Sequence, residues 1–206
     1  MKIGVLGTGM VGEAIGSKLV ALGHDVMMGS RTAQQPKAVA WVRRTGALAA
    51  TGRFEDTADF GEVVFNCTHG AHSIEVLRQA GADRLSDKIL IDVANTLPPD
   101  ASSAESLGER IQKAFPRTKV VKTLNTTNCD VMVNPSRLRD VHTMFMCGND
   151  AGAKATVRRL LESFGWKDIV DIGDITNARA TEQYLPLWLA LWKQLGTTLF
   201  NIRVVR

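Results

Sequence analysis

Short apolar runs of strand length alternate along this chain with longer stretches of helical period. The runs are almost continuously apolar, which is typical of strands covered on both faces of a parallel sheet. The alternation predicts a doubly wound, mostly parallel α/β sheet. Ser102 with Glu105 forms a capping box at the start of one helix, and Asp150 is placed to cap another. We expect eight strands, at residues 2–7, 25–29, 47–50, 63–68, 89–95, 119–125, 142–148 and 168–173.

The C-terminal segment has a different pattern. Residues 178–196 have the period of one helix, interrupted by Pro186, and this helix is apolar nearly all round. Tyr184, Trp188 and Trp192 recur four apart along one face. A helix of this composition is buried, either against its own sheet or against a partner subunit.

The domain organisation is simple, because no linker, internal repeat or low-complexity tract divides the chain. We expect a single domain over residues 1–206, with 176–206 as a C-terminal extension of helix and strand. Residues 197–206 are the candidate for a final strand in that extension.

Composition excludes several classes of protein. The net charge is +4, but the Lys and Arg residues are scattered, so we expect no nucleic-acid partner. Cys67, Cys129 and Cys147 form no CxxC pair, which argues against a disulfide framework and favours a cytoplasmic location. We interpret Cys67 and Cys129 as packing residues rather than nucleophiles. No apolar run has bilayer length and the start lacks a signal-peptide pattern, so we expect no membrane association.

A glycine-rich turn follows the first predicted strand and opens an amphipathic helix. In such a turn the first glycine permits the tight bend, the second lets backbone approach a pyrophosphate, and the third lets helix pack on strand. The N–H groups and dipole at the helix start then favour phosphate. The pattern predicts a Rossmann-type dinucleotide site, although a turn that binds nothing is the alternative. Its residues are Gly7, Thr8, Gly9, Met10, Val11 and Gly12.

The residues after the second predicted strand indicate which dinucleotide is bound. NAD-selective folds place a carboxylate there, which accepts a hydrogen bond from the ribose 2′-hydroxyl. This chain instead has Ser30, Arg31 and Thr32, with Lys37 a few residues later. A guanidinium is a charged donor fork that suits a phosphate group. We therefore predict NADP(H), with a solvated surface arginine as the alternative reading of Arg31.

The loops after the fourth, fifth and sixth predicted strands carry little ionisable chemistry. His69 is their one plausible general acid, and a hydrogen-bonded structural histidine beside a ligand is the alternative. No third ligand accompanies His69 and His72, so we predict no metal site. We expect Lys122, within the sixth strand, to point to an edge or ligand pocket. The scarcity of ionisable side chains in these loops favours direct hydride transfer from nicotinamide to a second conjugated ring. The protein would then supply orientation and exclude water.

Four segments, taken in order, resemble the NADPH-dependent coenzyme F-420 reductase family (F-420:NADP oxidoreductase). They are "MKIGVLGTGMVGEAIGSKLVALGHDVMMGSRT", "VVKTLNTTN", "CGNDAGAKATVRRLLESFGW" and "DIGDITNARATEQYLPLWLALW". The arrangement is also similar to the cytosolic reductase domain of membrane metalloreductases. The resemblance implies hydride transfer between NADP(H) and the deazaflavin coenzyme F-420, or a flavin, in a homodimer.

The resemblance also assigns residues. NADP contacts map onto the first turn at Thr8, Gly9, Met10 and Val11, and onto Ser30 and Arg31. Nicotinamide contacts map onto Thr68, His69 and Ala94, and acceptor-side contacts fall around Asn125, Thr126 and the final helix. Two other functions stay open. One is NADPH-dependent reduction of a flavin or of a small imine or carbonyl compound, and the other is a non-catalytic NADP(H) sensor.

Overall fold

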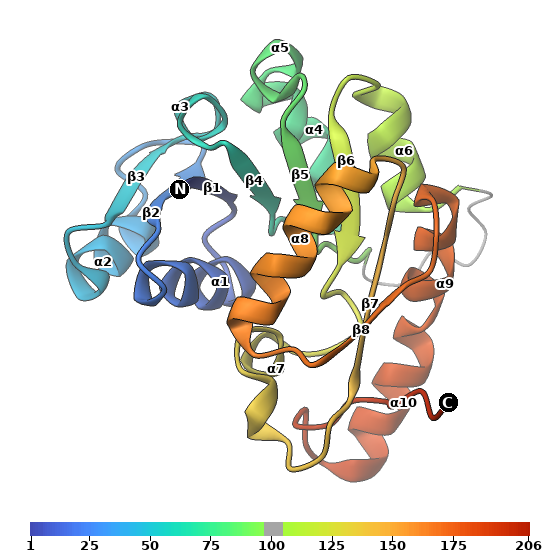
Figure 1. The fold of residues 1–206 in the computed structure, drawn as a ribbon. Helices are drawn as coiled ribbons and strands as arrows, with labels where there is room; N and C mark the ends of the chain where they lie inside the picture. Colours follow the sequence, from blue (N-terminus) through green and yellow to red (C-terminus); the bar gives the residue numbers. More distant parts are fainter. Residues whose placement is uncertain (97–104) are drawn as a thin grey trace.

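One eight-stranded sheet forms the centre of the computed structural model, which describes residues 1–96 and 105–206 (Figure 1). The strand order is β3-β2-β1-β4-β5-β6-β7-β8, and β6 and β7 are the one antiparallel pair in it. The predicted doubly wound, mostly parallel sheet is confirmed. The strands are β1 (Lys2–Leu6), β2 (Asp25–Ser30), β3 (Ala49–Arg53), β4 (Val63–Asn66), β5 (Ile89–Asp92), β6 (Lys119–Thr123), β7 (Thr143–Gly148) and β8 (Asp168–Asp171).

Helices cover both faces of this sheet. Successive residues of the central strands alternate between two apolar clusters, one on each face, as in Val120 and Val121 of β6. The first cluster takes in α1, α2, α7 and α8, and the second takes in α3, α4, α6 and α9. The helices are α1 (Met10–Ala21), α2 (Pro36–Thr45), α3 (Phe54–Phe60), α4 (Gly70–Ala80), α5 (Ala82–Leu85), α6 (Leu107–Ala114), α7 (Cys129–Val133), α8 (Ala151–Phe164), α9 (Ala178–Gln183) and α10 (Leu185–Leu195), with short turns η1 (Pro135–Arg137) and η2 (Ile175–Asn177).

The third strand begins and ends later than predicted. It covers Ala49–Arg53 instead of 47–50, and α3 follows it directly. The pairing of β3 with β2 sets this register, with Val26 opposite Ala49. The Thr51 hydroxyl donates to backbone carbonyls on the β2 side, at Met28 and Ala33, which holds the polar end of the strand in the sheet.

Two predicted helix caps have different outcomes. The side chain of Asp150 accepts from the Ala153 N–H at 2.7 Å, so the predicted cap of α8 is confirmed. Ser102 lies outside the described residues. The observed capping box of α6 lies one turn later, at Ser106 and Glu109, where each side chain accepts from the other residue's backbone N–H.

The C-terminal segment corrects two predictions. The expected single helix is two, α9 and α10, which meet at Tyr184, and Pro186 lies in the first turn of α10 where a missing N–H costs little. The expected final strand is absent from residues 197–206. They run beside the start of β7 instead, where the Thr143 N–H donates to the Ile202 carbonyl.

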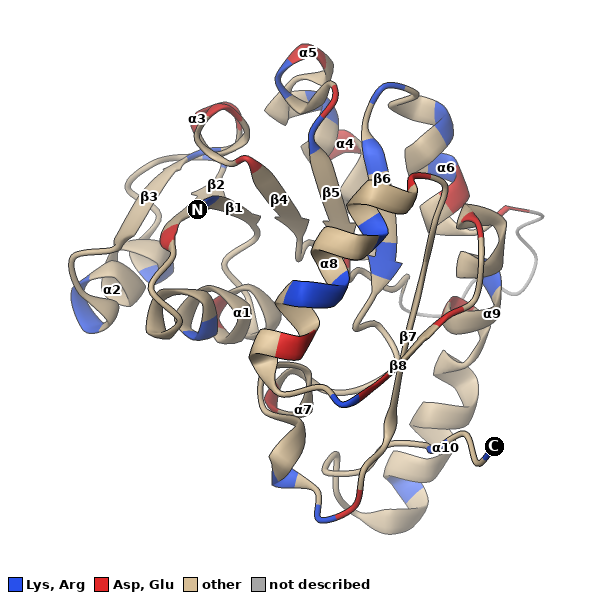
Figure 2. Ribbon diagram, viewed as in Figure 1, with Lys and Arg blue, Asp and Glu red and all other residues tan. Residues whose placement is uncertain are grey.

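The apolar helix α10 is not buried within the chain. Leu185 is its one buried residue, while the exposed fractions of Leu187, Trp192 and Leu195 are 54%, 46% and 55%. Figure 2 shows α10 almost without charge, and Lys193 is its one charged residue. Of the two alternatives for this helix, burial against its own sheet does not hold for α10, and burial against a partner subunit stays a prediction. Within the described residues, no helix has both the length and the apolarity to cross a membrane.

Candidate functional site

The glycines of the first turn divide into two kinds. Gly7 has a φ of +115°, and a Cβ there would lie 2.8 Å from the Cys67 carbonyl oxygen. A Cβ at Gly12 would collide with the Gly7 carbonyl. The positive φ of Gly7 fits its predicted role in the tight turn, and the close contact at Gly12 fits its predicted role in packing. Gly9 differs, because its φ is −82° and a Cβ would meet nothing within 4 Å. Nothing inside the described chain requires glycine at position 9. The absence of a side chain at Gly9 leaves open space beside the turn.

The start of α1 faces that open space with unused donors. Gly9 caps the helix with no side-chain hydrogen bond, and its carbonyl accepts from the Glu13 N–H at 2.9 Å. The N–H groups of Met10, Val11 and Gly12 belong to the first turn, which has no intrahelical acceptor for them. Free donors, the positive end of the helix dipole and room for an anion together fit a pyrophosphate group.

The turn after β2 presents cations beside this cradle. The Gly7 N–H donates to the Gly29 carbonyl at 3.0 Å, which joins the two turns. Ser30 is buried, and its hydroxyl donates to the Thr32 carbonyl at 2.6 Å, so its proton is used inside the turn. Arg31 and Lys37 are exposed and make no ion pair or hydrogen bond within the described residues. These two side chains are available to a phosphate group.

Three loops at the carboxyl edge of the sheet are joined in series. The Gly70 N–H donates to the Asn95 carbonyl at 3.0 Å, and a Cβ at Gly70 would lie 2.7 Å from the Asn95 backbone. The Asn95 side chain donates to the Asn125 carbonyl at 2.7 Å, and the Asn125 side chain donates back at 3.1 Å. The predicted contacts Thr68 and Ala94 lie in two of these loops. Sequence reasoning missed Gly70 and Asn95, although an asparagine after each of two neighbouring strands is a usable signal.

His69 has a structural contact in this region. It is the N-cap of α4, where its Nδ1 accepts from the Ala71 N–H at 3.3 Å. This contact fits the reading of His69 as a hydrogen-bonded structural histidine. The His72 ring lies 5.8 Å away, and among the described residues no group of three possible ligands is arranged to hold a metal ion.

Lys122 contradicts its prediction, because it points neither to an edge nor to a pocket. The side chain is fully buried, and its Nζ lies 2.8 Å from Asp92 Oδ2, 2.9 Å from Glu182 Oε1 and 2.5 Å from the Ala94 carbonyl oxygen. Burial lowers the pKa of Lys122, but the two carboxylates outweigh that effect and raise the pKa above its ordinary value. Lys122 is therefore a buried cation.

The two cysteines near the site are unreactive in character. Cys67 and Cys129 pack against the first apolar cluster. Burial raises the pKa of both thiols, and the Asp92 carboxylate raises that of Cys67 further. A raised pKa removes the thiolate that a nucleophile needs, so both residues fit the predicted packing role.

The far side of the site has buried polar atoms without partners. Asn125 Oδ1 and Thr126 Oγ1 are buried, and neither has a hydrogen-bond partner within the described chain. The C-terminal tail closes this side, because Asn128 donates to the Thr198 hydroxyl at 2.6 Å. An oxygen acceptor next to a hydroxyl group fits a ligand edge that carries both N–H and C=O groups.

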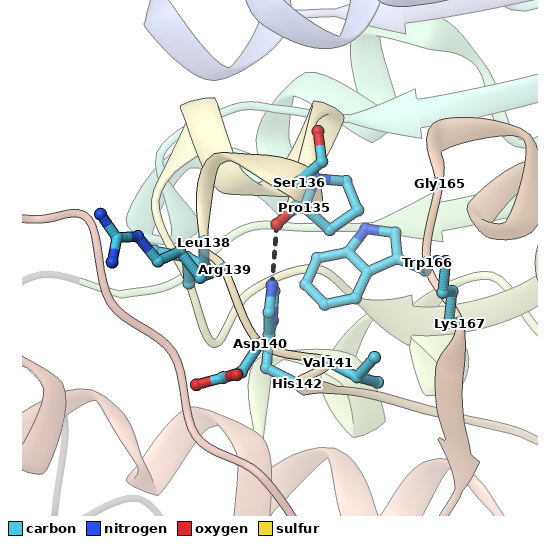
Figure 3. A pocket seen from close by; sticks show the side chains of 10 residues that line it. All are labelled: Pro135, Ser136, Leu138, Arg139, Asp140, Val141, His142, Gly165, Trp166 and Lys167. Carbon is cyan, nitrogen blue, oxygen red and sulfur yellow. Dashed lines mark hydrogen bonds between the residues drawn. The ribbon is translucent and has the colours of Figure 1, made fainter.

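A separate pocket of about 190 Å³ lies beside η1 and the start of β7 (Figure 3). His142 there bonds the Pro135 carbonyl through Nε2 and the Asn201 side chain through Nδ1, and its ring meets Trp166 edge-on at 4.8 Å. Both ring nitrogens are thus used, so this pocket has no free histidine for acid–base chemistry. The lining residues are Pro135, Ser136, Leu138, Arg139, Asp140, Val141, His142, Gly165, Trp166 and Lys167.

Comparisons with known proteins agree with this geometry. Residues 2–96 match the family described as NADP oxidoreductase, coenzyme F420-dependent. A crystal structure from Arthrobacter sp. FB24, of a protein assigned as an F420-dependent NADP reductase, is 44% identical, with a TM-score of 0.93 over 100% of both chains. The chain belongs to this family. It is thus a member of a family of NADP-dependent oxidoreductases, and the predicted resemblance is confirmed.

More distant relatives extend this family assignment. The F420-dependent NADP reductase of Methanocaldococcus jannaschii is 26% identical over 233 residues, which is 96% of each chain. Metalloreductase STEAP3 of Rattus norvegicus is 29% identical over 192 residues, which is 91% of this chain but 38% of that protein. The chain therefore spans well under half the length of this metalloreductase. A reductive aminase from Aspergillus terreus in complex with NADPH, at 16% identity and a TM-score of 0.70, shares the fold alone.

Proposed function

We propose that this protein transfers hydride between NADP(H) and the deazaflavin coenzyme F-420. The observation that carries the proposal is the pairing of two unused features at one sheet edge. Gly9 leaves an unfilled space at the start of α1, and Arg31 presents an unpaired guanidinium at the end of β2. The first suits a pyrophosphate and the second suits a 2′-phosphate.

The other half of the site supports a reaction that needs little acid–base chemistry. Within the described residues, these loops carry His69, one nitrogen of which caps α4, and the Cys67 thiol, whose pKa burial raises. When bound, NADPH would supply the hydride. The chain would hold the nicotinamide ring at Thr68, His69 and Ala94, hold the acceptor at Asn125, and exclude water between the rings.

We also propose that the protein acts in the cytoplasm as a homodimer. The exposed side chains of Leu187, Trp192 and Leu195 form an apolar surface on α10, and we propose that a second copy of the chain covers it. On the same helix, the ring of Trp188 stacks on the ring of Phe200, with 5.4 Å between the ring centroids. The three free cysteines suit a reducing compartment.

Stopped-flow oxidation of NADPH with several acceptors tests the hydride acceptor. We expect the fastest turnover with F-420, slower turnover with FMN, and little with a cyclic imine or a ketone. Turnover with FMN that equals or exceeds that with F-420 would move the assignment to a flavin reductase, and the same result with the imine would move it to a small-molecule reductase. Tight NADPH binding without turnover on any acceptor would identify a sensor.

A further inference from the structure

A buried ion-pair network joins the carboxyl ends of β5 and β6 to α9. This inference rests on the proposed NADP(H) site. If the 2′-phosphate meets Arg31 at β2 and the pyrophosphate meets Gly9 at β1, the rest of the dinucleotide continues along the edge to β4 and β5, the next strands in the sheet. The backbone at the ends of those two strands therefore faces the ring.

Lys122 is the centre of this network, and all three of its donors are used. An ammonium group has three N–H bonds, and the Nζ of Lys122 has three oxygen neighbours, on Asp92, Glu182 and Ala94. The side chains of Lys122 and Asp92 are both 0% exposed. Glu182 also accepts from the N–H groups that start α6, at 2.8 Å and 3.1 Å, which ties α9 to the network.

The peptide groups on both sides of Ala94 are held by this ion pair. The Ala94 carbonyl accepts from Lys122, and the Ala94 N–H donates to Asp92 Oδ1 at 3.2 Å. The same Oδ1 accepts from the Asn66 side chain at 2.8 Å, and Asn66 in turn accepts from the Thr68 hydroxyl at 2.6 Å. One buried lysine thus sets the backbone after β5 and, through Asp92 and Asn66, the loop after β4.

Stability alone does not explain such an arrangement. Desolvating two charges is costly, and apolar side chains of similar volume often serve stability as well or better. What an ion pair adds at this position is one fixed orientation of the Ala94 peptide. A fixed peptide matters where a ring must be held at a defined angle for transfer.

We propose that Lys122 is a positioning residue, which orients the strand-end backbone at Ala94 against the nicotinamide ring. It does not touch the nucleotide, and its contribution is specific to the ring half of the ligand. The adenosine half, held at Gly9 and Arg31, is set independently of it.

The test compares two ligands on the full chain by calorimetry: NADPH, and 2′,5′-ADP, which has the adenosine half alone. The main variant is the double substitution Lys122→Met with Asp92→Asn, which removes both charges of the Lys122–Asp92 pair and keeps the oxygen that faces Asn66. Glu182 loses its lysine partner in this variant but keeps the N–H groups that start α6. We expect the dissociation constant for NADPH to rise about tenfold while that for 2′,5′-ADP stays within about twofold. Lys119→Met is the matched control, a half-exposed lysine on the same strand that pairs with Asp150 at 3.6 Å, and it should change neither dissociation constant.

Several outcomes overturn the inference. If both dissociation constants rise in parallel, or neither moves, Lys122 is structural and does not position the ring. If the double variant does not fold, the isosteric Asp92→Asn alone must show the same preferential loss of NADPH, in smaller measure, for the inference to stand. If wild-type protein does not bind 2′,5′-ADP at all, the proposed NADP(H) function fails first, and that result is distinct from the others.

Discussion

The two ends of the proposed nucleotide site are built in opposite ways. The adenosine end, at β1 and β2, offers groups that have no partners in the described chain. They are exposed cations, such as Arg31, and the backbone N–H groups at the start of α1. The ring end, at β4 to β6, is a buried and largely satisfied network around Asp92 and Lys122. Phosphate groups bring their own charge, so their site needs only donors left open. A ring that must be aligned for hydride transfer needs a surface that is set in advance.

The sharpest way to break this comparison is to fill the space above the first turn. Gly9→Val should abolish measurable NADPH binding, a loss of about a hundredfold or more, because the side chain occupies the pyrophosphate position. Its thermal unfolding should stay close to wild type, since a Cβ at Gly9 meets nothing within 4 Å. Calorimetric titration and a thermal melt on the same sample check both statements.

Gly12→Val is the contrasting variant for that experiment. A Cβ at Gly12 collides with the Gly7 carbonyl, so this substitution should lower the free energy of unfolding by several kcal/mol whether or not ligand is present. If Gly9→Val is the less stable of the two, or if it binds NADPH normally, the cradle has been placed on the wrong residues.

A substitution of Arg31 tests the second phosphate contact of the adenosine end, the contact with the 2′-phosphate. Arg31→Ala should weaken NADPH binding by about 1.5–3 kcal/mol, since a charge-assisted contact is lost, and should hardly affect NADH. Fluorescence titration with both nucleotides measures the difference. Arg78→Ala, on the exposed side of α4, is the control and should leave both affinities unchanged. Equal losses for NADPH and NADH would contradict the 2′-phosphate assignment.

The apolar surface of α10 belongs to neither end, and its prediction concerns assembly. Trp192→Glu should weaken the binding free energy of the proposed dimer by about 2 kcal/mol, which raises its dissociation constant roughly thirtyfold. The reason is that an exposed tryptophan is the kind of side chain that dominates interfaces. Sedimentation velocity over a range of concentrations measures it. Gln194→Glu, exposed on the same helix, is the charge-matched control. A wild-type chain that sediments as a monomer at every concentration rejects the homodimer.

The sequence was most informative where the deciding interactions are local. In the turn from Gly7 to Gly12, the positive φ of Gly7 and the contact of Gly12 with the Gly7 carbonyl are local features, although the space at Gly7 is also closed by the distant Cys67. The strands followed from continuous apolar runs, which are typical of a sheet that helices cover on both faces, as they do here. At β3 the apolar signal is short, and pairing with β2 moved the strand toward Thr51 and Arg53.

It was least informative where partners come from distant segments. Lys122 meets Asp92 and Glu182, which are 30 and 60 positions away, and nothing within its own strand indicates that pairing. For α6, two consecutive S-x-x-E patterns, at 102–105 and 106–109, match a capping box equally well. The helix starts at Leu107, with Ser106 of the second pattern as its N-cap, and Glu182 accepts from its first N–H groups.

The smallest predicted effect lies away from both ends, at the start of α8. Asp150 caps this helix, and the hydrogen bond from the Ala153 N–H holds the pKa of its carboxyl below the ordinary value. A carboxyl with a depressed folded-state pKa stabilises the protein above its unfolded pKa, and that contribution is lost as pH falls through the folded pKa. Asp150→Ala should therefore lower Tm slightly at pH 7, and the difference should shrink as pH falls through the depressed folded-state pKa of this carboxyl. NADPH affinity should not change, because the cap touches neither end of the site. If affinity falls with Tm, binding follows global stability, and the separation of the two ends would need another explanation.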